Sequence, residues 1–115
     1  MIGPVYDDIR KAVQAETARA KAAFGDIYAS PHEAWGVLME EWDEAFEEVE
    51  QAGERMRCIA RDIRNPGEGL ALTLDGIRYH AMLAACELIQ VAAVCEKALG
   101  TLQKQGVVQL AEHHE

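Results

Sequence analysis

SPHEAWGVLMEEWDEAFEEVE, residues 30–50, carries the clearest structural signal in the chain. Its apolar residues recur every three or four positions, which is the period of an amphipathic helix and not of a strand. They are Trp35, Leu38, Trp42, Ala45 and Val49. The start is also marked, because Ser30 is a favourable N-cap, Pro31 suits the first helical position, and Glu33 follows the cap by three residues as in a capping box. The stretch therefore predicts a helix that begins at Ser30 and Pro31.

The same helical periodicity extends on both sides of this stretch. Residues 5–24 are rich in Ala and predict a helix that ends near Gly25. Gly53 either weakens the helix that starts at Ser30 or separates it from a short helix over residues 54–63. Residues 77–102 predict the last and most apolar helix.

One loop-like region interrupts the interior of the chain, and it runs from Asn65-Pro66-Gly67 to Asp75-Gly76. It is too short to be a domain linker, and strand signals are essentially absent. We therefore predict an all-α bundle of three or four helices.

Length and composition limit the size of the core and suggest how it is completed. The 115 residues make one domain, over residues 1–115, and half of them (50%) are hydrophobic while only 6% are aromatic. A small bundle with few aromatic residues gains by burying further surface between copies, so we expect oligomerisation. Residues 107–115 are expected to form a flexible tail.

The charge balance excludes several classes of function. Twenty acids against eleven Lys and Arg give a net charge of −9, which disfavours binding to nucleic acid and to anionic membranes. Seven of these acids lie between Glu40 and Glu50, a stretch that contains no base. The three cysteines show no CxxC spacing, and no leader or membrane-spanning stretch is recognisable. We expect a cytoplasmic protein.

Two clusters of polar residues interrupt otherwise apolar helix faces. Glu41 and Glu44 share one helix face at the edge of the apolar stripe, where a carboxylate needs a cation, a hydrogen-bonding partner or a proton. Glu87 stands within the apolar run of the last helix, with Gln90 one turn later and His80 two turns earlier. If the two helices pack antiparallel, Glu41, Glu44 and Glu87 converge on an all-oxygen site suited to Mg²⁺.

The same residues also allow less specific interpretations. An acidic run on a helix is usually a solvated face. Glu87 could be the structural partner of an arginine, and both His80 and Gln90 could be partly buried residues whose hydrogen bonds are satisfied. Spacing alone leaves these alternatives open.

The order of these motifs resembles a known family. Glu40-Glu41-Trp42-Asp43-Glu44 followed some forty residues later by Glu87-Leu88-Ile89-Gln90 is similar to the EExxE and ExxD motifs of MazG-like proteins. These belong to the all-α nucleoside triphosphate pyrophosphohydrolase superfamily, and the similarity is greatest to its small single-domain members from phages and bacteria. The resemblance covers residues 30–100 approximately.

Carried over residue by residue, the resemblance implies a set of roles. Glu41, Glu44 and Glu87 match magnesium ligands, with Mn²⁺ as a possible substitute, and Gln90 occupies the position of the last acid of the second motif. An amide oxygen binds Mg²⁺ without contributing charge, so this departure weakens the expected site, for which Asp43 or Glu48 could compensate. We expect Glu40 to act as the catalytic base. Arg57, Arg61 and His80 are expected to contact the substrate.

The activity implied is hydrolysis of a nucleoside triphosphate between its α and β phosphates, which yields a monophosphate and pyrophosphate. Family members form homodimers or homotetramers, which the resemblance therefore also implies. The alternative hypothesis, prompted by Gln90, is a non-catalytic helical module that dimerises or senses nucleotides through a degenerate metal site. A di-iron bundle is disfavoured, since the helices contain no ExxH pair.

Overall fold

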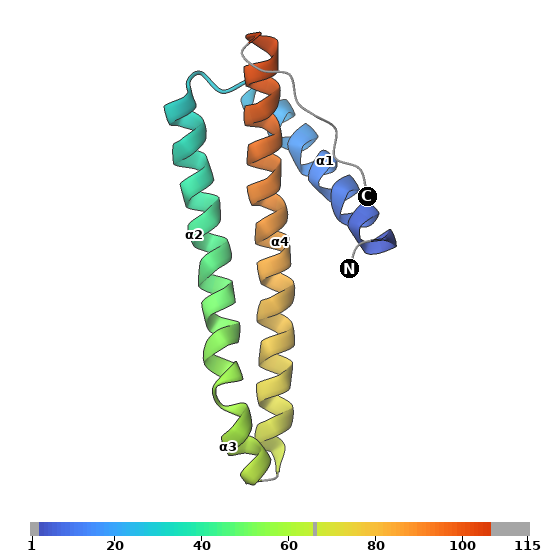
Figure 1. Cartoon of the computed structure of the whole chain (residues 1–115), viewed down its shortest axis with the longest axis vertical. Coiled ribbons are helices and arrows are strands. Elements are labelled where there is room, and N and C mark those ends of the chain that lie inside the picture. The colour runs from blue at the N-terminus through green and yellow to red at the C-terminus, as the bar shows by residue number, and fades with distance from the viewer. Residues whose placement is uncertain (1–2, 66, 107–115) are drawn as a thin grey trace. The chain divides into compact units, whose positions relative to one another are not determined.

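The computed structural model describes residues 3–65 and 67–106, and the tail expected over residues 107–115 lies outside them. Four helices follow one another along the described chain (Figure 1). They are α1 (Pro4–Phe24), α2 (Pro31–Met56), α3 (Ile59–Arg64) and α4 (Glu68–Lys104). No strand occurs within these described residues, so the predicted all-α class is confirmed.

Contacts divide the chain into two compact units. Unit 1 combines the chain up to Glu40 with the chain from Ile89 onward, and unit 2 comprises Glu41–Leu88. The helices α2 and α4 each contribute to both units. The prediction of a single domain over the whole chain stays a prediction.

The start of α2 follows the sequence signal. The Ser30 hydroxyl oxygen accepts a hydrogen bond from the Glu33 backbone N–H at 3.1 Å, and the Glu33 carboxylate accepts one from the Ala29 backbone N–H, also at 3.1 Å. These bonds satisfy N–H groups that have no partner within the helix. The predicted cap at Ser30 is therefore confirmed.

The loop predicted up to Gly76 is wrong for most of its length, because α4 already begins at Glu68. Gly76 does not mark a turn. It serves close packing instead, since a Cβ atom there would lie 2.6 Å from Nε of Arg55 on α2. A glycine within a helix is tolerated where it makes room in this way.

The apolar stripes predicted as core are only partly covered. Ala45 is buried, but Trp35, Trp42 and Val49 of the same stripe are 62%, 50% and 48% exposed. Five apolar side chains are buried in the described part of the chain: Val13, Tyr28, Ala45, Ala84 and Ala93. Three of these are alanines, whose small side chains allow helices to approach closely where they pack, whereas Trp35 and Trp42 stay largely exposed.

Unit 2 is an antiparallel hairpin of α2, α3 and the first part of α4. Glu48 contacts His80, Arg55 lies against Gly76, and Asp62 accepts a hydrogen bond from Thr73. Residue numbers rise on one helix as they fall on the other, which fixes the antiparallel register. The antiparallel packing that the sequence interpretation required is therefore present.

Unit 1 is formed by α1, the segment that leads into α2, the first part of α2 and the last part of α4. The Tyr28 backbone N–H donates to the Thr101 hydroxyl at 3.2 Å, and that hydroxyl donates to the Lys97 carbonyl at 2.9 Å. The Lys97 ammonium lies 4.3 Å from the centre of the Tyr28 ring, a cation–π contact. These contacts hold the segment before α2 against α4.

None of the described helices combines the length and the apolar character needed to cross a bilayer.

Candidate metal centre

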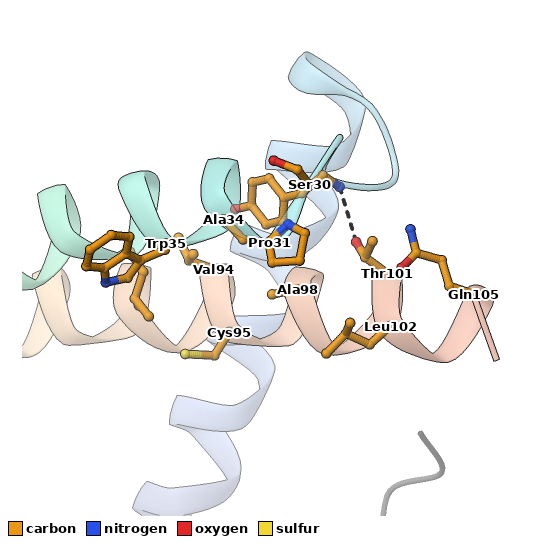
Figure 2. Close-up of a pocket in the computed structure, with 12 residues that line it drawn as sticks. Ser30, Pro31, Ala34, Trp35, Val94, Cys95, Ala98, Thr101, Leu102 and Gln105 are labelled. Carbon is orange, nitrogen blue, oxygen red and sulfur yellow. Dashed lines mark hydrogen bonds between the residues drawn. The ribbon is translucent and has the colours of Figure 1, made fainter. Parts of the chain in front are cut away.

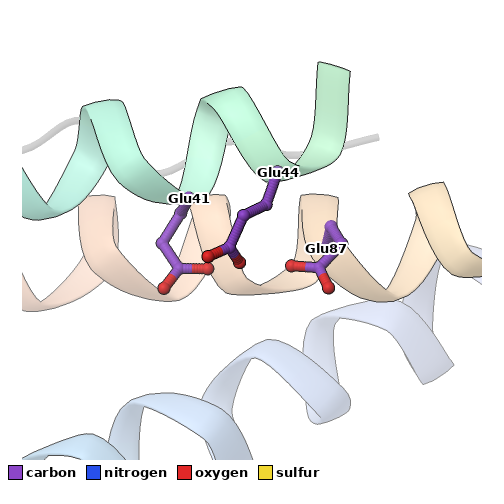
Figure 3. Close-up of side chains that lie close together, drawn as sticks. All are labelled: Glu41, Glu44 and Glu87. Carbon is purple, nitrogen blue, oxygen red and sulfur yellow. The ribbon is translucent and has the colours of Figure 1, made fainter. Parts of the chain in front are cut away.

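Three glutamates from two helices of unit 2 converge, as the sequence led us to expect if the two helices packed antiparallel (Figure 3). One carboxylate oxygen from each of Glu41, Glu44 and Glu87 can be chosen so that all three lie within 4.8 Å of one another. Glu41 and Glu44 lie three residues apart on α2 and therefore share a face, while Glu87 approaches from α4. Glu41 and Glu87 are half-buried and Glu44 is exposed, so the cluster opens to solvent on one side.

The electrostatics of Glu87 show how crowded these carboxylates are. Desolvation raises the pKa of Glu87, and the negative charge and hydrogen bond of Glu44 raise it further. The charge of Glu48 acts in the same direction. Each cause opposes the ionised form of Glu87, so a proton or a cation at this position relieves the repulsion.

Glu48 continues the acidic row of α2 by one turn and has a partner on α4. Its Oε2 atom lies 2.7 Å from Nδ1 of His80, and the two side chains are 24% and 16% exposed. His80 thus holds a carboxylate in place within unit 2. The spacing of Glu44 and Glu48 indicates a shared face, but nothing in the sequence pairs Glu48 with His80.

Glu40 and Gln90 have different surroundings from the three clustered glutamates. Glu40 is exposed on α2. Gln90 is half-buried, and its side-chain amide donates a hydrogen bond of 2.8 Å to Oε2 of Glu16 on α1. This bond occupies one amide hydrogen of Gln90 and leaves its carbonyl oxygen as the atom that could bind a cation. Their predicted roles as base and ligand stay predictions.

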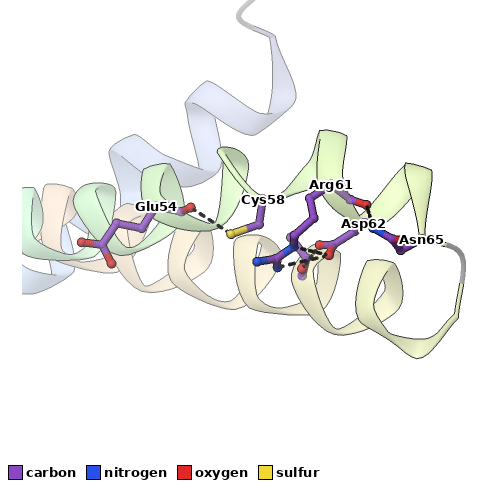
Figure 4. A network of polar contacts seen from close by, with 6 residues as sticks. Glu54, Cys58, Arg61, Asp62 and Asn65 are labelled. Carbon is purple, nitrogen blue, oxygen red and sulfur yellow. Dashed lines mark hydrogen bonds and ion pairs between the residues drawn. The ribbon is translucent and has the colours of Figure 1, made fainter.

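The predicted substrate-binding arginines lie near the turn between α2 and α3. Arg57 is exposed, and Arg61 has a side chain that is 65% exposed. Arg61 donates from Nε and Nη2 to Oδ1 of Asp62 at 3.3 and 3.2 Å. The Thr73 hydroxyl donates to the other oxygen of Asp62, and Figure 4 shows the α3 side of this network.

Asp62 has a structural function that sequence reasoning missed. Its side chain is buried, and its pKa is lowered mainly by the hydrogen bond from Thr73 and further by Arg61, against the opposing effect of burial. It joins α3 to α4 and thereby closes the hairpin. Asp62 stands in an ordinary charged stretch of the sequence, so no local pattern identified it.

Unit 1 contains a cavity of about 250 Å³ that the sequence did not predict (Figure 2). It lies between the start of α2 and the end of α4, where Trp35, Val94, Ala98 and Leu102 contribute apolar surface. The hydrogen bond from Tyr28 to Thr101 borders it. An apolar lining of this kind does not suit a triphosphate, so the carboxylates of unit 2 are the stronger candidate site.

The chain was compared with protein-family models, with curated proteins and with solved structures, and nothing in these three sets matches it.

Proposed function

We propose that Glu41, Glu44 and Glu87 bind Mg²⁺ and that the protein is a Mg²⁺-dependent nucleoside triphosphate pyrophosphohydrolase. The observation that carries the proposal is the convergence of carboxylates from α2 and α4 within 4.8 Å. The order of the acidic motifs along the chain supports the same assignment, since it resembles the MazG-like pattern.

The chemistry of the donor set fits a hard divalent cation. All three side chains offer oxygen ligands, which Mg²⁺ and Mn²⁺ both accept. The pKa of Glu87 is raised by desolvation and by the charges of Glu44 and Glu48, so a cation beside Glu87 would relieve this repulsion. When bound, Mg²⁺ supplies positive charge that offsets repulsion between these carboxylates and a triphosphate and polarises the phosphoryl group under attack.

The side chains of the chain itself perform the remaining steps. Glu40 is the proposed base, which accepts a proton from the attacking water. Arg57 and Arg61 are proposed to contact the phosphates, and the exposed side chain of Arg61 is accessible to an anion despite its contact with Asp62. His80 contributes through Glu48, which it holds beside the cluster. The products are a nucleoside monophosphate and pyrophosphate.

The direct test is release of pyrophosphate from a panel of ribo- and deoxyribonucleoside triphosphates in the presence of Mg²⁺. We expect turnover of at least one of them, and a loss of at least about a hundredfold in Glu87→Gln, since mutation of residues that only support a metal ligand already costs roughly 10–100-fold. Glu47→Gln is the matched control, because Glu47 is an exposed acid on the same helix. Absence of pyrophosphate from every nucleotide, with helicity intact by circular dichroism, would refute the proposed activity.

A second candidate function is a non-catalytic module that binds a nucleotide or associates with other helices. The observation that favours it is Gln90, whose amide bonds to Glu16 in a position where the resemblance expects an acid. In this case metal affinity is residual, and Gln90→Asp should strengthen it. An unchanged Mn²⁺ titration of Gln90→Asp would count against a degenerate site at this position.

Self-association completes the proposal. The resemblance implies a homodimer or homotetramer, and the large exposed apolar side chains of this small bundle favour burial between copies. Sedimentation velocity of the full chain tests this point independently of turnover.

A further inference from the structure

The cavity of unit 1 lies in a part of the chain that the proposed metal chemistry does not use. Its walls come from the start of α2 and the end of α4 (Figure 2). All of the residues that line it belong to Met1–Glu40 or to Ile89–Glu115, so the cavity is a feature of unit 1 by itself. The carboxylates of the candidate metal centre belong to unit 2.

The charges in and around the cavity disfavour a charged ligand. None of the described residues that line it is Asp, Glu, Lys, Arg or His, so an ion would lose its hydration there without gaining an ion pair. The Lys97 ammonium lies 4.3 Å from the centre of the Tyr28 ring, which is part of the lining, and it repels a cation. The net charge of −9 repels an anion. These charges favour an uncharged ligand.

The two aliphatic hydroxyl groups of the lining already form hydrogen bonds within the chain. The Thr101 hydroxyl accepts one from the Tyr28 backbone N–H at 3.2 Å and donates one to the Lys97 carbonyl at 2.9 Å. The Ser30 hydroxyl accepts one from the Glu33 backbone N–H at 3.1 Å. A polar ligand would have to compete with these bonds, whereas an apolar ligand leaves them in place.

Much of the remaining wall is apolar and accessible. Pro31, Ala34 and Trp35 contribute apolar surface from α2, and Val94 and Ala98 contribute it from α4. Pro31 is exposed and Trp35 is 62% exposed, so the cavity opens to solvent and a ligand can enter it without unfolding the helices. Removal of apolar surface from water would drive the binding of an apolar ligand.

We infer that the cavity of unit 1 binds a small uncharged hydrocarbon. An apolar cavity of roughly 150 Å³ accepts benzene, so the cavity of about 250 Å³ has room for an apolar molecule of roughly ten non-hydrogen atoms. A nucleobase of similar size suits the cavity poorly, because its hydrogen-bonding groups would lie against apolar walls. The inference does not rest on the proposed hydrolase activity.

The test is a titration with ethylbenzene, which is larger than benzene and lies within this size limit. The chain contains two tryptophans, so Trp42→Phe leaves Trp35 as the only one. A ligand in the cavity covers the exposed indole of Trp35 and should shift its emission to shorter wavelength. We expect saturation with a Kd of roughly 0.1–1 mM, since a ligand of this size contributes little free energy per atom. Absence of a saturable shift, with helicity intact by circular dichroism, would overturn the inference.

Charged analogues of the same shape test the chemical class of the ligand. Phenylacetate carries a carboxylate and benzylammonium carries an ammonium group in place of the methyl group of ethylbenzene. Each should bind at least about tenfold more weakly, because neither charge finds a partner in the lining. Thymidine should not displace ethylbenzene. Equal affinity for either ion, or displacement by thymidine, would overturn the assignment of an uncharged hydrocarbon.

Variants that fill the cavity locate the bound ligand. Ala98→Phe adds volume from α4 and Ala34→Leu adds it from α2, and each, made in the Trp42→Phe background, should weaken ethylbenzene binding at least about tenfold. Ala85→Phe is the matched control, because Ala85 is an exposed alanine of α4 that does not line the cavity. The same affinity in all three variants would place the ligand elsewhere and overturn the inference.

Two other occupants of the cavity are outcomes of the same titration. Weaker binding at high protein concentration would identify a second copy of the chain as the occupant. Tighter binding in the full-length variant Leu110→Asp would identify residues 107–115 as the occupant. Either result overturns the inference, which expects the same affinity in both comparisons. Pyrophosphate release tests the proposed activity separately, because hydrocarbon binding requires no Mg²⁺.

Discussion

Nδ1 of His80 lies 2.7 Å from Oε2 of Glu48, so a histidine of α4 holds a carboxylate of α2 two helical turns away from Glu87. The same Glu48 contributes to the raised pKa of Glu87. One polar contact therefore joins the two helices, while negative charge further along the same face pushes them apart. The predictions for His80, for Glu87 and for Mg²⁺ follow from the Glu48–His80 contact and from the repulsion between the carboxylates near Glu87.

Replacement of His80 should weaken unit 2. His80→Ala removes the partner of a carboxylate that is only 24% exposed, so we expect the free energy of unfolding to fall by about 1 kcal/mol. Urea denaturation followed by circular dichroism measures the change. His32→Ala is the control, because His32 is exposed at the start of α2 and should change stability little. Equal effects of the two substitutions would show that the contact with Glu48 contributes nothing.

Metal-free stability should depend on pH through Glu87. Because the folded protein raises the pKa of Glu87, it binds that proton more tightly than the unfolded chain does. Protonation of Glu87 therefore stabilises the folded protein fully at pH values below the pKa that Glu87 has in the unfolded chain. This stabilisation is lost as pH rises through the pKa of Glu87 in the folded protein. Relative to Glu87→Gln, the wild type should therefore lose melting temperature as pH increases from acidic toward neutral values. Melting curves in EDTA measure the difference in melting temperature between the wild type and Glu87→Gln at each pH. A difference that does not change with pH would contradict the prediction.

Divalent cations should stabilise the folded protein selectively. Mg²⁺ that binds the native cluster raises the melting temperature, and a concentration of a hundred times Kd corresponds to about 2.7 kcal/mol. Glu87→Gln should reduce this gain and Glu47→Gln should preserve it, since Glu47 is not one of the clustered acids. Scanning fluorimetry with and without Mg²⁺ measures both effects. The same gain in both variants would place the cation elsewhere.

Thr73→Val should loosen the attachment of α3 to α4. The hydrogen bond from the Thr73 hydroxyl is the main cause of the lowered pKa of Asp62. Ionised Asp62 therefore stabilises the folded protein at pH values above the pKa that Asp62 has in the unfolded chain. That contribution is lost as pH falls through the folded pKa. We expect Thr73→Val to lower the melting temperature at neutral pH, with a difference that narrows in strong acid. Thr73→Ser keeps the donor and should retain most of the stability.

Lys97→Met should destabilise unit 1 although it adds an apolar side chain to a buried position. Lys97 is only 3% exposed, and its ammonium lies 4.3 Å from the centre of the Tyr28 ring. Loss of a cation–π contact costs about 0.5–2 kcal/mol. Thermal unfolding of Lys97→Met measures the loss, and Lys104→Met is the control, since the Lys104 side chain is 59% exposed. Equal stability of Lys97→Met and the wild type would contradict a favourable contact with Tyr28.

Local patterns predicted those features that depend on neighbours in the chain. The Ser30 cap, the helical class and the shared face of Glu41 and Glu44 follow from bonds and spacings within one or two turns. The prediction of a loop before Gly76 was wrong because Gly76 depends on a residue that is distant in the chain and not on its neighbours. Glycine usually signals a turn, but here it makes room for Arg55, a residue more than twenty positions earlier.

The sequence by itself determined that this chain is helical, that Glu41 and Glu44 share a helix face and that Glu87 stands in an apolar run, since helix periodicity and capping are properties of short segments. Only the tertiary structure decided that Glu87 meets Glu41 and Glu44, that His80 takes Glu48, and that Trp42 and Val49 stay exposed. The physical reason is the register of two antiparallel helices. A shift along the helix axis would pair other residues at nearly the same local cost, so the register depends on contacts between distant residues, such as Glu48 with His80, Arg55 with Gly76 and Asp62 with Thr73.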